Sequence, residues 1–92
     1  MNKNELILRI AEETTLPRKT VEIALNATFN QITQAMAEGE RVQIVGFGSF
    51  ETKERAERIG RNPRTGEEVP IPAATVPVFK PGKALKDAVD QQ

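Results

Sequence analysis

Four arginines recur at every third position in one stretch of the chain: Arg55, Arg58, Arg61 and Arg64. A guanidinium group stays charged at physiological pH, and its fork of N–H donors matches the oxygens of a phosphate. Between Thr52 and Arg58 the only apolar side chain is Ala56, so this segment has little surface to bury in its own domain. The pattern predicts an exposed segment that binds phosphates.

The residues needed for the common kinds of catalysis are missing. The chain has no His and no Cys, which excludes nucleophilic triads and ordinary zinc sites. Paired carboxylates such as Glu12-Glu13 and Glu67-Glu68 are interpreted as solvated faces. The glycine pair in Gly46-Phe47-Gly48 precedes a predicted strand and lacks the Lys-Ser/Thr of a phosphate-binding loop. We therefore expect no enzyme, no cofactor and no metal site.

The arginines are predicted to lie on a protruding two-stranded ribbon. The stretch from Val69 to Phe79 supplies a returning strand, and Asn62 to Gly66 supplies the turn. A dozen extended residues reach roughly 40 Å, and such a ribbon fits a DNA groove. On a continuous strand, steps of three alternate faces, so we expect Arg55 and Arg61 on one face and Arg58 and Arg64 on the other.

Two other interpretations of this ribbon remain open from the residues alone. In the first, it is a solvated hairpin whose arginines pair across the strands with nearby glutamates, namely Glu54, Glu57, Glu67 and Glu68. The other open question is the role of Pro63 at the turn. It is either an ordinary turn proline or an apolar wedge that enters between base pairs from the minor groove.

The remaining chain predicts an α+β fold. Asn2 caps a first helix that ends near Thr14, and a second amphipathic helix runs from Pro17 to a cap at Gly39. Alternation over residues 41–45 predicts a strand that turns at residues 46–48 into a second strand. A short helix over residues 83–89 closes the chain, with Leu85 and Val89 inward. A helix-turn-helix reader is disfavoured because the second helix is long and apolar on one face.

The length of the chain and the distribution of its charges limit what it can bind. Ninety-two residues without cysteine make a short core once the ribbon is set aside, so we expect a second copy of the chain to complete it. The net charge is zero, but residues 1–40 carry four basic and six acidic side chains, whereas residues 53–64 carry five basic and two acidic. The positive charge is concentrated on the ribbon. No signal peptide or membrane-length apolar run is seen, which indicates a soluble, intracellular protein.

Several motifs together resemble the bacterial histone-like HU family and the related integration host factor subunits. They are Gly46-Phe47-Gly48-Ser49-Phe50, the stretch from Arg58 to Gly66, Ile71-Pro72-Ala73, and the stretch from Pro77 to Lys86. The resemblance covers essentially the whole chain. It implies an intertwined dimer with a three-stranded antiparallel sheet and two arms that bind and bend double-stranded DNA in the minor groove, with low sequence specificity. It also implies a role in compacting the chromosome and a cytoplasmic, nucleoid-associated location.

Carried over by position, the resemblance names the site residues. Those expected to contact DNA are Lys3, Lys53, Arg55, Arg58, Arg61, Asn62, Pro63, Arg64, Lys80, Lys83 and Lys86. Those expected in the dimer core are Phe29, Phe47, Phe50 and Phe79. The chain is expected to be one domain: a helical dimerisation region over 1–40, a sheet over 41–80 with the arm at about 53–76, and a C-terminal helix over 81–92. The partner is double-stranded DNA, with a homodimer or a heterodimer with a paralogue.

Alternatives remain beside this interpretation. Val69-Pro70-Ile71 and the stretch from Phe79 to Lys83 also resemble integration host factor, which would make the chain a sequence-preferring bender. An RNA-binding or protein-interaction module remains as an alternative from another functional class.

Overall fold

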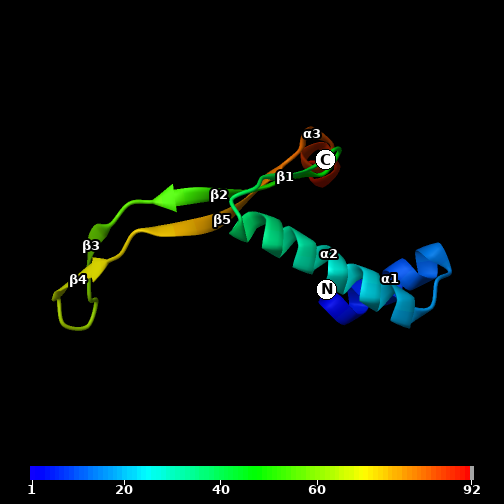
Figure 1. The fold of residues 1–92 in the computed structure, drawn as a ribbon, viewed down its shortest axis with the longest axis horizontal. Helices are drawn as coiled ribbons and strands as arrows, with labels where there is room; N and C mark the ends of the chain where they lie inside the picture. Colours follow the sequence, from blue (N-terminus) through cyan, green and yellow to red (C-terminus); the bar gives the residue numbers. More distant parts are fainter. Residues whose placement is uncertain (92) are drawn as a thin grey trace. The chain divides into compact units, whose positions relative to one another are not determined.

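The computed structural model describes residues 1–91 and has the α+β fold that the sequence predicts (Figure 1). The helices are α1 (Lys3–Thr14), α2 (Arg18–Ala37) and α3 (Lys83–Val89). The strands are β1 (Val42–Ile44), β2 (Gly48–Arg55), β3 (Arg58–Arg61), β4 (Glu68–Ile71) and β5 (Ala74–Pro81). Two compact units make up the chain, the first over Met1–Gln34 and the second from Ala35 onward. Within residues 1–91, none of the helices is long and apolar enough to cross a lipid bilayer.

Local signals begin and end the first two helices. The Asn2 side chain accepts a hydrogen bond from the backbone N–H of Glu5 at 2.9 Å, which caps α1 as predicted. At the end of α2, Gly39 has a φ of 82°. There the N–H of Gly39 bonds the carbonyl of Met36, and the N–H of Glu40 bonds the carbonyl of Ala35. This pair of bonds is a Schellman motif, which explains the glycine.

A three-stranded antiparallel sheet in the order β1-β2-β5 forms the base of the second unit. Residues of β1 pair with the start of β2, and β2 pairs with β5 along its whole length, from Gly48 opposite Pro81 to Arg55 opposite Ala74. Gly46 makes the predicted turn between β1 and β2 with a φ of 85°. The long β2–β5 pairing is what carries the chain out toward the arm (Figure 1).

Gly48 is required where β5 crosses the start of β2. A Cβ atom at this position would lie 2.6 Å from the backbone oxygen of Lys80 and 2.8 Å from the ring of Phe79. Its φ of 158° also disfavours a side chain. The glycine therefore allows the close approach of the two strands.

The arm is interrupted between two hairpin segments. After β2 ends, Ala56 and Glu57 lie outside the strands, opposite Pro72 and Ala73, and β3 and β4 then pair as a separate two-stranded sheet. The prolines were expected to make the returning strand irregular or edge-like. In the structure the three prolines occupy different positions. Pro77 lies within β5, which is an edge strand, and Pro70 lies within β4. Pro72 lies in the break between the two strands.

A single chain leaves much of its apolar surface uncovered. Among the described residues, the buried hydrophobic side chains are Ile7 and Val21, whereas Phe29 is 44% exposed. The prediction that Val89 points inward is wrong for the single chain, in which Val89 is 76% exposed. These exposed faces are what a second copy would need to cover.

Candidate nucleic-acid interface

The arm holds the four arginines at different kinds of position. Arg55 ends β2, Arg58 and Arg61 begin and end β3, and Arg64 lies in the turn between β3 and β4. All four side chains are exposed. The expectation of alternating faces along one strand is therefore corrected: it holds only for Arg58 and Arg61, since the break after Arg55 and the turn at Arg64 remove the strand periodicity.

None of these arginines forms an ion pair with a carboxylate of residues 1–91. Ion pairs within residues 1–91 involve only the carboxylates of Glu51 and Asp87. Arg61 lies directly opposite Glu68 in the hairpin register, yet the two side chains form no ion pair. Glu54 instead accepts a hydrogen bond from the hydroxyl of Thr75 across the strands, at 2.9 Å. The interpretation as a hairpin held by arginine–glutamate pairs is therefore wrong for this structure.

The tip is shaped by backbone bonds around Asn62. Its backbone N–H donates to the carbonyl of Glu67 at 2.8 Å, and its carbonyl accepts from the N–H of Gly66 at 2.8 Å. Its side-chain oxygen accepts from the N–H of Arg64 at 2.8 Å, which is an Asx turn. Pro63 stays exposed at the apex. The tip is thus closed by Asn62, while Pro63 is presented to solvent.

Two of the lysines expected to meet phosphates are engaged within the chain. The ammonium of Lys80 on β5 lies 3.0 Å from a carboxylate oxygen of Glu51 on β2, whose side chain is 20% exposed. Lys83 lies 2.7 Å from Asp87, one turn further along α3. Lys3, Lys53 and Lys86 are exposed, and the structure gives them no ion pair within residues 1–91.

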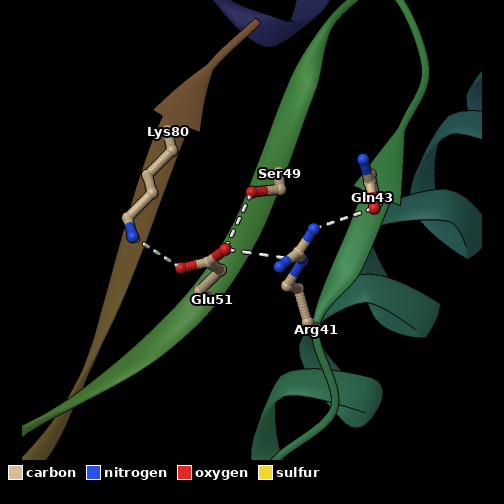
Figure 2. A network of polar contacts seen from close by, with 5 residues as sticks. All are labelled: Arg41, Gln43, Ser49, Glu51 and Lys80. Carbon is tan, nitrogen blue, oxygen red and sulfur yellow. Dashed lines mark hydrogen bonds and ion pairs between the residues drawn. The ribbon is translucent and has the colours of Figure 1, made fainter.

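Glu51 is the centre of a polar network that spans three strands (Figure 2). Besides Lys80, it accepts a hydrogen bond from Ser49 at 3.1 Å and lies 3.5 Å from the Nε of Arg41, whose Nη2 donates to Gln43. The hydrogen bond from Lys80 lowers the pKa of Glu51 most, and Ser49 and the nearby positive charges add to this against partial desolvation. This cluster could not be predicted from the sequence, because only the strand register brings Arg41, Glu51 and Lys80 together.

Three of the four phenylalanines expected in the dimer core gather on the second unit. The ring of Phe79 lies 4.9 Å from that of Phe50 and 5.5 Å from that of Phe47, measured between centroids. Phe47 and Phe79 remain substantially exposed. Phe29 lies on α2, in the other unit. Their role in a dimer stays a prediction.

Known proteins resemble this chain over nearly its full length. Residues 1–90 match a family model described as bacterial DNA-binding protein. The chain is 58% identical over 89 residues to the DNA-binding protein HU of Geobacillus stearothermophilus, covering 97% of this chain and 99% of that relative. It is 56% identical over 91 residues to the HU protein of Clostridium pasteurianum, covering 99% and 100%. The Anabaena HU–DNA cocrystal structure matches with a TM-score of 0.94 and 42% identity, with both chains covered in full. The likeness therefore includes the arm as well as the body.

Proposed function

The chain belongs to the HU family of bacterial DNA-binding proteins, and we propose that it acts as a histone-like architectural protein on double-stranded DNA. It binds as a homodimer in the minor groove with low sequence specificity, bends the duplex, and so compacts the chromosome in the nucleoid. It is a binding protein and not an enzyme.

The arm is the observation that carries this proposal. Its arginines are exposed, and no carboxylate within residues 1–91 neutralises them. Phosphates line both sides of a groove, and Arg58 and Arg61 leave opposite faces of β3, so one hairpin can reach both walls. The Anabaena HU–DNA cocrystal structure has the same fold over the full chain. Phosphate contacts carry no sequence information directly, which supports binding to unrelated duplexes.

The proposed interface consists of the arm and the exposed cations of the body. It comprises Lys3, Lys53, Arg55, Arg58, Arg61, Asn62, Pro63, Arg64, Lys80, Lys83 and Lys86. Within it the structure supports two different roles at the tip. Asn62 holds the turn, and Pro63 at the apex is the wedge that opens a base step.

A homodimer completes the fold in this proposal. Within residues 1–91, Phe29 on α2 and Phe47 and Phe79 of the sheet unit stay substantially exposed in the single chain, and a second copy would cover them. The phenylalanines proposed for the shared core are Phe29, Phe47, Phe50 and Phe79.

A gel-shift competition tests the choice of nucleic acid. Random duplex DNA, nicked duplex DNA and duplex RNA compete for the protein, and we expect the nicked duplex to bind most tightly because it bends at lower cost. Tightest binding to RNA would reject the proposal. A preference of more than about a hundredfold for one intact duplex sequence would instead indicate a bender of the integration host factor type.

Substitution of the apical proline tests the bending. Pro63→Ala should reduce energy transfer between dyes at the two ends of a duplex and weaken binding to straight DNA. It should spare binding to nicked DNA, where unstacking is partly complete. The thermal midpoint should stay unchanged, because Pro63 is exposed and the hydrogen bonds of the tip come from Asn62, Glu67 and Gly66. A lowered midpoint with an intact bend would make Pro63 a structural turn residue.

A further inference from the structure

The outer hairpin of the arm carries an exposed aliphatic side chain that phosphate binding does not explain. Ile59 lies in the middle of β3 and is 64% exposed, although it is flanked in sequence by Arg58 and one residue away from Arg61. Its cross-strand neighbour is Pro70, which is also exposed. The pair makes a small apolar patch on a cationic arm.

The strand register places this patch on one face of the hairpin. On β3, Ile59 and Arg61 share a face with Pro70 and Glu68 on β4, because side chains alternate along each strand. On the other face the side chain of Ile71 lies over Gly60, where a Cβ would be 2.7 Å from the Ile71 Cδ1. Ile59 has no such cover. Val69, which shares the Gly60 face, is 43% exposed, against 64% for Ile59, so the face of Ile59 presents the more exposed of the two side chains.

The chemistry around the patch selects the partner. An apolar protein groove would have to desolvate Arg61 beside Ile59, which is costly without an acidic group to pair with it. The minor groove of a DNA duplex presents deoxyribose edges between two rows of phosphates, so it offers apolar and anionic surface at the spacing of one hairpin. We propose that Ile59, with Pro70, packs against deoxyribose edges in the minor groove and adds a salt-independent component to DNA affinity. This inference rests on the proposed function and assigns a role to the exposed isoleucine that phosphate binding leaves unexplained.

A different reason for an isoleucine at this position is its preference for strands. β-branched residues favour strand conformation whatever they contact. Two substitutions separate the explanations. Ile59→Thr keeps the branched β-carbon but removes apolar surface, whereas Ile59→Leu keeps the apolar surface but loses the branch. Ile23 on α2 is 61% exposed and lies off the arm, so Ile23→Thr is the matched control.

The experiment measures affinity by fluorescence anisotropy over a range of salt concentrations on one duplex of arbitrary sequence. The slope of log affinity against log salt reports phosphate contacts, and the value extrapolated to 1 M salt reports the remainder. Ile59→Thr should lower affinity about fourfold per arm, and about tenfold or more for a dimer, at every salt concentration and with an unchanged slope. Ile59→Leu and Ile23→Thr should match the wild type.

Two outcomes overturn the inference. The first is wild-type affinity for Ile59→Thr, and a loss for Ile59→Leu beside it would point to strand preference instead; the other is a change of slope for Ile59→Thr. The last would mean that the substitution acts by displacing the arginines. Failure of the wild-type chain to bind the duplex would instead reject the proposed function itself, so the two failures are distinct.

Discussion

Arg61→Ala and Lys80→Ala each remove one positive charge from the proposed interface, and the structure predicts that their effects on salt dependence differ. Arg61 on β3 is exposed and has no ion-pair partner within residues 1–91. Lys80 on β5 is already 3.0 Å from a carboxylate oxygen of Glu51. A DNA phosphate can therefore pair with Arg61 without breaking an existing ion pair, whereas a phosphate that binds Lys80 must compete with Glu51.

The size of the effect follows from counterion release. Each phosphate neutralised contributes about 0.9 to the slope of log affinity against log salt, so removing Arg61 from both copies of a homodimer should flatten the slope by about 1.8. Between 50 and 200 mM salt, the ratio of wild-type affinity to variant affinity should therefore fall by roughly tenfold. For Lys80→Ala we expect a change of less than about 1, because its charge is neutralised within the protein before DNA arrives.

The assay is a set of anisotropy titrations on two unrelated duplexes at four or more salt concentrations. Arg9→Ala, which removes an exposed charge from α1 at a position outside the proposed interface, is the control and should leave the slope unchanged. An unchanged slope for Arg61→Ala, or equal flattening by Lys80→Ala, would show that ion pairing in the free protein does not decide which cations the DNA uses. An effect confined to one duplex would show that Arg61 reads sequence rather than phosphates.

Three further predictions concern stability. Gly48→Ala should lower the free energy of unfolding by about 1–3 kcal/mol in a denaturant titration, because its Cβ would meet the backbone of β5; Gly60→Ala, where only the flexible end of Ile71 must move, should cost much less. The thermal midpoint should rise with protein concentration if a dimer covers the exposed phenylalanines, and an invariant midpoint would contradict the dimer. Glu51 has a lowered pKa in the folded state, so its stabilising effect is present above about pH 4.5 and is lost as the pH falls through the folded-state pKa. Glu51→Gln should therefore reduce the loss of thermal stability on acidification. Glu68→Gln, at an exposed position with no ion pair within residues 1–91, should leave that loss unchanged.

Features set by neighbouring residues were predictable from the sequence. The cap of α1 needs only Asn2 and the N–H three residues later, and the end of α2 needs only Gly39 and the carbonyls of the preceding turn. The bounds of α3 were predicted for the same reason, since Gly82 precedes the helix and the break is local. The burial of Val89 was not, because it depends on what packs against the helix.

Features set by strand register were not predictable. Three prolines occur along the returning stretch, and nothing local distinguishes Pro72, which interrupts the arm, from Pro77, which the edge strand accommodates. Glu51 precedes the charged residues of the arm in sequence, but pairing with β5 and β1 places it beside Lys80 and Arg41. The same register shows that Arg64 belongs to a turn, which removes the expected alternation of faces.

The distribution of ion pairs reconciles a net charge of zero with a DNA-binding arm. On the sheet, Glu51 is shared by Lys80 and Arg41, and on α3 Asp87 holds Lys83, so these cations bring their own counter-charges. On the arm, the arginines form no ion pair with any carboxylate of residues 1–91, and even Glu68, directly across from Arg61, does not pair with it. Charges separated by more than the Debye length, about 8 Å at physiological salt, are largely screened from each other. A duplex in contact with the arm therefore responds to the charges of the arm itself, where residues 53–64 carry five basic and two acidic side chains, rather than to the sum over the chain.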